Sequence, residues 1–158
     1  MRPIAIEPTA SISALLPGAS FADAFAIDID DPGLDADAAA RRVMGSVPGW
    51  VRYLLVLRDA VVRPFGLKGT DAVSKTVSDR IGFFPCISRS PKRVVMGFDD
   101  THLDFRVVVD LSKIDGASQR VTASTVVKPH NIFGRVYLTV VIPFHRRIVP
   151  AMLARVVQ

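Results

Sequence analysis

The chain has 158 residues, of which 49% are hydrophobic and 22% are charged, and its formal net charge is +5. This length predicts one domain with its own hydrophobic core and leaves no room for a second domain. The single cysteine, Cys86, excludes an internal disulfide, and no Cys/His cluster has zinc-ligand spacing, so we expect a reducing compartment and no metal.

The charge is unevenly distributed along the chain. Residues 1–37 contain seven of the 15 acidic side chains and one basic residue, Arg2, so the remainder carries 19 basic and 8 acidic residues. Such an excess can attract nucleic acid or an anionic membrane. The basic residues are nevertheless scattered singly or in pairs, without a basic-aromatic recognition motif. We therefore expect an ordinary solvated surface and no nucleic-acid partner.

The N-terminal half of the chain predicts a leader, a strand and two helices. Residues 1–20 lack the charge order and apolar length of a secretory signal, and we expect a loosely ordered leader before one domain over 21–158. The segment 21–29 has apolar residues near period 2 and ends in Asp-Asp-Pro-Gly, which predicts a strand and a turn. Asp35 precedes an Ala-rich run whose early acids and later arginines are typical of a short helix. The apolar spacing between residues 48 and 66 predicts a second helix.

The C-terminal half predicts a meander of antiparallel strands followed by a helix. Four strands are expected over 83–89, 93–98, 103–111 and 120–128, separated by short polar or Gly/Pro breaks. Residues 135–142 are ambiguous, because they are rich in β-branched side chains yet lie in an apolar stripe with helical spacing. We choose a helix, with a break or kink near Pro143. The apolar run 136–144 is shorter than the roughly 20 residues that cross a bilayer, so we expect a cytoplasmic protein without a transmembrane segment.

These elements indicate an α+β fold, in which a curved antiparallel sheet packs one face against the long, Pro-interrupted C-terminal helix. Three stretches, 48–68, 97–109 and 130–153, resemble an uncharacterised bacterial family of domains of unknown function. That family is grouped with the START-like, or helix-grip, superfamily, which includes polyketide cyclases and the birch-pollen allergen. The resemblance implies a cavity between the sheet and the C-terminal helix that accepts a small, mostly apolar ligand.

Related segments also occur behind a nucleotide-binding domain of the short-chain-dehydrogenase type. They end in a similar Gly-Arg-x-Tyr and Pro-Phe-His pattern, which here falls at 134–137 and 143–145. This chain has no Gly-rich dinucleotide loop, so we expect neither a redox role nor a cofactor.

The sequence GFDDTHLDFRV places four polar residues, Asp100, His102, Asp104 and Arg106, on one face of a predicted strand. If this polar row faces solvent, it only satisfies charges. If it faces the cavity, paired charges would form the polar end of an apolar pocket. An imidazole beside carboxylates could then act as a general base. The sequence leaves both alternatives open.

Five further residues are candidate ligand contacts. His130 and Asn131 precede the last helix, and they either cap it or form a polar gate over the cavity. His145 either ties that helix to a strand or contributes to the site. Arg58 either snorkels from the second helix or binds a ligand carboxylate, and Tyr137 can line a pocket. The three histidines lack the local spacing of a metal site.

Three functions remain open from the sequence. The leading hypothesis is non-catalytic binding of a small hydrophobic or amphipathic ligand, which enters where the helix opens near Pro143. The first alternative is a cyclase-, isomerase- or lyase-type enzyme that uses His102 with Asp104 or Asp100 as acid and base. The second alternative is a structural or protein-interaction module, such as a homodimer, which an exposed apolar patch on the last helix would favour.

Overall fold

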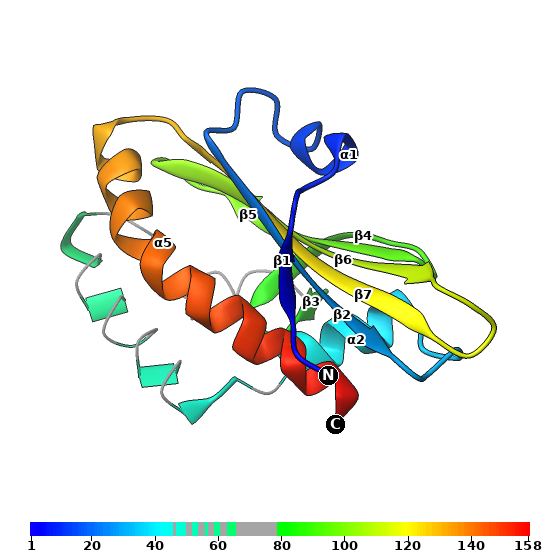
Figure 1. The fold of residues 1–158 in the computed structure, drawn as a ribbon. Coiled ribbons are helices and arrows are strands. Elements are labelled where there is room, and N and C mark those ends of the chain that lie inside the picture. Colours follow the sequence, from blue (N-terminus) through cyan, green and yellow to red (C-terminus); the bar gives the residue numbers. More distant parts are fainter. Residues whose placement is uncertain (46, 50–51, 54–55, 57–58, 61–62, 66–78) are drawn as a thin grey trace.

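The computed structural model describes residues 1–158 except 46, 50–51, 54–55, 57–58, 61–62 and 66–78. The described strands form one antiparallel sheet in the order β1-β2-β7-β6-β5-β4-β3. Their bounds are β1 Ile4–Ile6, β2 Phe21–Ile29, β3 Arg80–Ile81, β4 Phe84–Arg89, β5 Arg93–Asp99, β6 Leu103–Lys113 and β7 Gln119–Pro129. The long strands curve across the molecule, and the first long strand pairs with the last one (Figure 1).

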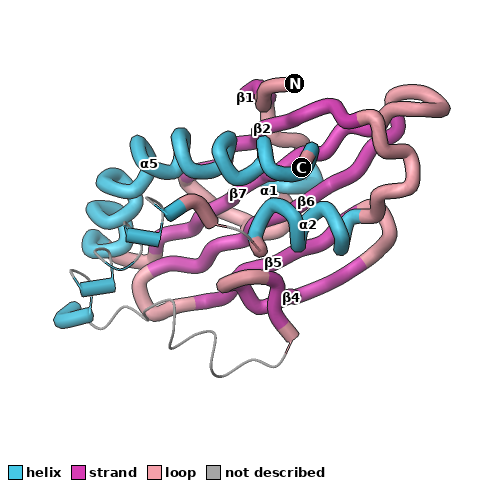
Figure 2. Tube along the Cα trace, turned by 90° about the horizontal axis from the view of Figure 1, so that it is seen from below, coloured by secondary structure: helices cyan, strands magenta, loops and turns pink. Residues whose placement is uncertain are grey.

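Helices cover the sheet unequally. The described helices are α1 (Ala10–Ser13), α2 (Ala36–Met44) and α5 (Ile132–Leu153), with 3₁₀ turns η1 (Arg63–Phe65) and η2 (Ala154–Val157). Helices α2 and α5 lie on one face of the sheet, and α1 lies on the other (Figures 1 and 2). The prediction of an α+β fold with an antiparallel sheet and a long C-terminal helix is therefore confirmed. The predicted second helix, over 48–66, lies partly outside the described residues; among those described, Gly49, Arg52, Tyr53, Val56, Asp59 and Ala60 are helical.

Helix α2 forms where the sequence predicts it and packs closely on the sheet. The Asp35 carboxylate accepts a hydrogen bond from the Ala38 amide at 2.8 Å, which satisfies one of the free donors of the first turn. Ala39, Ala40 and Val43 have no exposed surface. Two of these three side chains are a single methyl group, so the helix backbone can approach the strands closely.

Helix α5 has a glycine in its first turn and continues through two prolines. The Asn131 side chain caps it by accepting from the Gly134 amide at 2.9 Å. A Cβ at Gly134 would collide with the His102 carbonyl, so only glycine allows this close approach to the β5–β6 loop. The predicted break near Pro143 is wrong, since the helix continues to Leu153, whereas the alternative of a kink stays a prediction. Pro143 lies on the exposed side, where water can bind the carbonyl that loses its donor.

The main core lies between the sheet and the C-terminal end of α5. The buried strand residues of this core cluster are Phe25, Ile27, Ile29, Ile81, Val94, Met96, Val107, Val109, Leu111, Val121 and Ala123. They pack with α2, with Val156 of η2, and with Met152 and Leu153 of α5. Ile148 and Val149 pack against the same cluster while half-buried. The α5 residues that join this core all belong to the last third of the helix.

The other sheet face is also partly covered, by the segment expected to be a loose leader. Strand β1 pairs with β2, and Ile12 and Leu16 are buried against Val95, Val108 and Val126. Strands β5, β6 and β7 contain runs of consecutive apolar residues, which place apolar side chains on both faces. The leader packs on the sheet because the second face would otherwise expose those valines.

Among the described residues, one helix, Ile132–Val157, is long and apolar enough to cross a membrane by length and composition. This is weak evidence, since core helices of soluble proteins pass the same test. The sequence analysis predicts no transmembrane segment, because the apolar run 136–144 is too short by itself.

Candidate functional site

The four residues of the predicted polar row, Asp100, His102, Asp104 and Arg106, contact different partners in the structure. Asp104 and Arg106 occupy even positions of β6, on the same side as Val108, which packs against α1 and its neighbours. They therefore lie on the sheet face opposite α5 and do not line a site beneath that helix, which corrects the expectation for these two residues. The Arg106 guanidinium pairs with Asp99 at 2.8 Å. The Asp104 carboxylate lies 2.9 Å from Nε2 of His130.

His102 and Asp100 shape the loop between β5 and β6. Asp100 accepts a hydrogen bond from the Thr101 amide at 2.6 Å. Nδ1 of His102 lies 2.8 Å from the side-chain nitrogen of Asn131, and its ring packs on Phe133 at 4.8 Å. His102 thus links this loop to the first turn of α5. Its role as an acid or base stays a prediction.

The remaining candidates fall in three places. Arg58 lies outside the described residues. Tyr137 is half-buried on α5. Asn131 caps α5, and exposed His130 precedes it. His145 lies on the sheet-facing side of α5, where it meets a carboxylate that the sequence analysis did not single out.

That carboxylate is Asp23, which projects from β2 toward α5. Its Oδ1 atom lies 3.1 Å from Nε2 of His145, and the two side chains are 17% and 18% exposed. The Phe21 ring, two residues along the same strand, meets the His145 ring edge-on at 5.9 Å. Thr125, buried on β7, is the cross-strand neighbour of Asp23 on the same face. The middle of α5 therefore covers a small polar group in an apolar setting.

The second carboxylate oxygen of Asp23 is the unusual atom of this group. Oδ2 is buried and, in the part of the chain that the structure describes, has no hydrogen-bond partner. A buried polar oxygen without a partner costs free energy, because burial removes its hydrogen bonds to water and no protein donor replaces them. The sequence contains a signal for it: Asp23 is the one polar residue in the odd positions of β2, between Phe21 and Phe25.

An aromatic surface lies on the same sheet face. The Phe105 ring contacts Phe98 at 4.6 Å and Phe84 at 5.5 Å, each in an edge-on arrangement. All three side chains are half-buried. In the N-terminal half of α5, Tyr137, Leu138 and Val141 are also half-buried. These side chains are more exposed than those of the main core.

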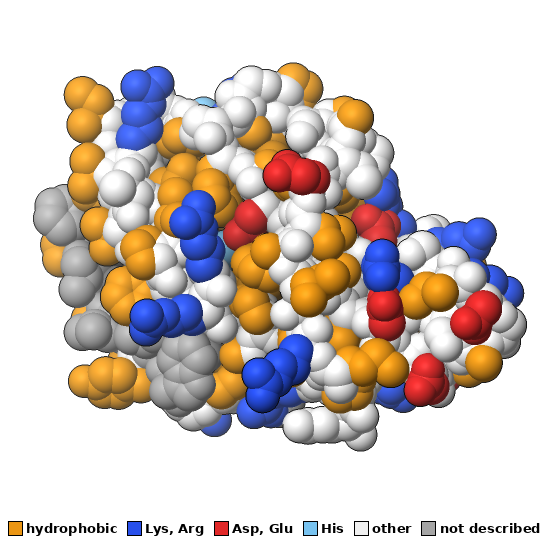
Figure 3. Space-filling model, in the orientation of Figure 1, with side chains coloured by type: hydrophobic (Ala, Val, Ile, Leu, Met, Phe, Trp, Pro, Cys, Tyr) orange, Lys and Arg blue, Asp and Glu red, His pale blue; other side chains and the backbone are white. Residues whose placement is uncertain are grey.

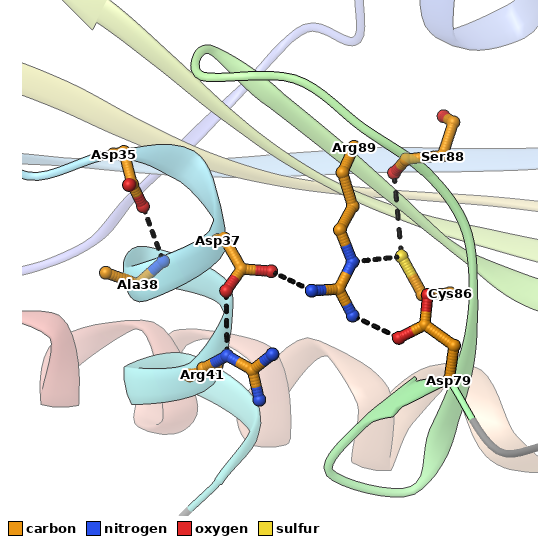
Figure 4. Close-up of polar contacts among 8 residues, drawn as sticks. All are labelled: Asp35, Asp37, Ala38, Arg41, Asp79, Cys86, Ser88 and Arg89. Atoms are coloured by element: carbon orange, nitrogen blue, oxygen red, sulfur yellow. Dashed lines mark hydrogen bonds and ion pairs between the residues drawn. The ribbon is translucent and has the colours of Figure 1, made fainter.

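Another polar cluster joins α2 to β4 (Figure 4). The Arg89 guanidinium donates to Asp37 at 2.7 Å and to the Cys86 sulfur at 3.1 Å, and it pairs with Asp79. The hydrogen bond with Cys86 raises the pKa of Arg89, and the charges of Asp37 and Asp79 add to this shift, while burial opposes it. Asp37 also pairs with Arg41 at 2.7 Å. These contacts fix the position of α2 on the sheet edge.

Two open hollows bounded by described residues lie at the edge where the chain termini meet. One, of about 360 Å³, is formed by Met1, Asp28–Asp31, Arg42 and the last three residues. The other, of about 280 Å³, lies between the N-terminal segment and β2. Neither includes Asp23 or His145. Within the described part of the chain, no three His, Cys, Asp or Glu side chains form a metal-binding group.

The fold and this site define a class: an α+β fold with one sheet, a long C-terminal helix across one face, and a half-buried His-Asp pair beneath that helix. Residues 15–152 match the model of a family described as "Protein of unknown function (DUF2867)". The chain belongs to this family, and the match includes both Asp23 and His145.

Other comparisons add little. No curated protein matches the chain. A solved structure, described as a conserved protein from Geobacillus kaustophilus, is similar with a TM-score of 0.39 and 8% identity, over 86% of this chain and 92% of the other. A similarity this low carries no argument about function.

Proposed function

We propose that the protein is a helix-grip binder of a small amphipathic molecule, held between the sheet and α5 with Asp23 as its polar anchor. The observation that carries the proposal is the buried, partnerless Oδ2 atom of Asp23. A ligand hydroxyl or ammonium group would supply the missing donor, and the apolar body of the ligand would lie against the surrounding aliphatic and aromatic side chains.

The contacts of Asp23 support a site that is prepared for such a donor. Nε2 of His145 contacts Oδ1 of Asp23, and β2, the strand that carries this carboxylate, is paired with β7. The acceptor therefore keeps its orientation before ligand binds, which lowers the entropic cost of binding. A negatively charged acceptor also discriminates: it favours cations and hydroxyls and repels a ligand carboxylate.

The entry route follows from the packing of α5. Its last third is fixed in the main core, whereas several side chains of its N-terminal half are half-buried, and Pro143 follows this half on the exposed side. A helix that lacks one backbone donor and has few core contacts opens at lower free energy than the sheet. Local opening of this half would admit a ligand to Asp23 without unfolding the core.

The first experiment compares three ligands with the same ten-carbon chain: decylamine, decanol and decanoate. Isothermal titration or native mass spectrometry with the full chain should rank their affinities in that order. Asp23→Asn should lower the affinity for decylamine by about ten-fold or more, because it removes the negative charge of the carboxylate. For the same reason, the variant should no longer discriminate against decanoate.

Asp104→Asn is the matched control. Asp104 has the same exposure as Asp23 and also pairs with a histidine, but on the opposite sheet face. It should leave all three affinities unchanged. Equal binding of the three ligands, or equal effects of the two substitutions, would contradict the proposal.

A catalytic function is a second candidate, because the structure contains a histidine oriented by a carboxylate. The pair is His145 with Asp23, rather than the His102 pair expected from the sequence. An imidazole so held could transfer a proton in a cyclase-, isomerase- or lyase-type reaction. Extraction of bound organics before and after incubation distinguishes the functions: a binder returns its ligand unchanged, whereas an enzyme returns a product that His145→Gln abolishes.

A further inference from the structure

The outer side of α5 carries an apolar stripe that faces solvent. Ile132, Val136, Val140 and Phe144 recur every four residues and are 79%, 58%, 60% and 48% exposed. This spacing places them along one side of the helix, about opposite the side that carries His145 and Met152 toward the sheet. Single exposed apolar residues are ordinary, but a continuous stripe along one helix indicates a binding surface.

Basic side chains accompany this stripe. Arg135, Arg146 and Arg147 are exposed and, among the described residues, none of them forms an ion pair. By helical spacing Arg147 lies in line with the stripe, and the other two lie along one flank of it. Residues 130–158 contain no acidic residue. Figure 3 shows hydrophobic and basic side chains sharing the surface over α5, while most acidic side chains in this view lie over the strands.

We propose that the outer face of α5 docks on an anionic lipid surface, with the stripe inserted between headgroups and the arginines against lipid phosphates. Charge complementarity selects this occupant. A second copy of the chain would bring two uncompensated arginine groups together in a symmetric interface, which repels. An anionic membrane supplies the negative charge that this face lacks, and each basic residue near such a surface strengthens binding about five-fold.

The helix would lie in the plane of the interface. Met152 and Leu153 belong to the main core, and His145 contacts Asp23 of β2. A transmembrane orientation would expose those residues to lipid and would remove α5 from the sheet face that it covers. A helix with one face on protein and the other apolar and basic is the pattern of interfacial docking.

The test uses the full chain and phosphatidylcholine vesicles with and without phosphatidylglycerol, measured by co-sedimentation. Binding should appear with phosphatidylglycerol and weaken as salt is raised. The double variant Val136→Glu/Val140→Glu should reduce the partition coefficient by about ten-fold or more, because it replaces inserted apolar surface with negative charge. The pair Arg146→Gln/Arg147→Gln should have a similar effect through charge alone.

The matched control is Ile87→Glu/Ile114→Glu, since these isoleucines are 52% and 48% exposed on β4 and the β6–β7 turn. This control should bind vesicles nearly as well as the parent chain. Far-UV circular dichroism checks that each variant is folded. An absence of binding to phosphatidylglycerol vesicles, or equal losses in the control, overturns the proposal. A dimer by light scattering that Val136→Glu/Val140→Glu dissociates also overturns it, because the stripe would then be an interface between copies.

Discussion

The two ends of α5 meet the same sheet in different ways. At the C-terminal end, Met152 and Leu153 are buried together with α2 and η2 in one continuous apolar cluster. In the N-terminal half, Tyr137 and Val141 are half-buried, and the contact further along, at His145, is a polar one with Asp23. Within the described part of the chain, the Asp23 carboxylate at this second contact has a buried oxygen without a hydrogen-bond partner.

This difference shows how one helix can serve both stability and binding. Close-packed apolar residues at one end fix the helix on the sheet, so the other end can keep an unfavourable buried carboxylate without loss of the fold. A half-covered apolar surface with one unmet acceptor is unfavourable for stability and suitable for a ligand. The following substitutions test this division.

The largest effect should come from the C-terminal end. Leu153→Ala should lower the free energy of unfolding by about 2–5 kcal/mol, because it leaves a cavity in a close-packed cluster. Leu138→Ala, in the half-buried part of the same helix, should cost about 1 kcal/mol or less, since less apolar surface is lost from the protein interior. Urea denaturation of both variants measures the difference, and equal costs would contradict a division of α5 into two regions.

The start of α5 should be the second most sensitive position. Gly134→Ala adds a methyl group against the His102 carbonyl, and we expect a loss of about 1–3 kcal/mol as the first turn moves away from the β5–β6 loop. Gly116→Ala is the control, because a Cβ there meets no atom within 4 Å. If Gly134→Ala is as mild as the control, the first turn is not fixed at this contact and the looser region extends to the helix start.

A substitution at the polar end should act in the opposite direction on stability. Asp23→Asn removes a buried charge whose second oxygen is unpartnered, so the ligand-free protein should become more stable by up to about 1 kcal/mol. Asp104→Asn, in the paired control position, should not stabilise the protein. A clear loss of stability for Asp23→Asn would mean that its contact with His145 outweighs the unmet acceptor.

The smallest effect should come from a surface ion pair. The hydrogen bond from Arg120, at 2.6 Å, lowers the pKa of Asp28 below its ordinary 3.8; burial opposes this shift, and the charge of Arg120 adds to it. A depressed folded-state pKa contributes stability above pH 3.8 that is lost as the pH falls through the folded-state value. Because both side chains are more than a third exposed, Asp28→Asn should cost well under about 1 kcal/mol at pH 7.

Chemical denaturation of Asp28→Asn and the parent chain between pH 7 and pH 2 measures this contribution. The difference should be constant down to about pH 4 and shrink below it. A difference that grows on acidification would contradict this assignment and would show that stability at this end of the sheet depends on charge as well as on burial.

The sequence by itself determined most of the secondary structure. The period-2 pattern of 21–29, the cap at Asp35 and the Gly/Pro breaks between strands are local signals, and the strands and α2 lie where these signals place them. The ambiguity of 135–142 resolved as a helix because apolar spacing over 22 residues outweighed local β-propensity. The helix continues through Pro143, so the expected break did not form, while a kink there stays a prediction.

Only the tertiary structure decided the site. His145 and Asp23 are 122 residues apart, and their contact exists because the first long strand pairs with the last and α5 crosses over both. The same packing placed Asp104 on the far sheet face beside His130, and it buried Ile12 of the expected leader under the second apolar face. Local patterns state which residues alternate along a strand, but the partner of each face depends on elements distant in the chain.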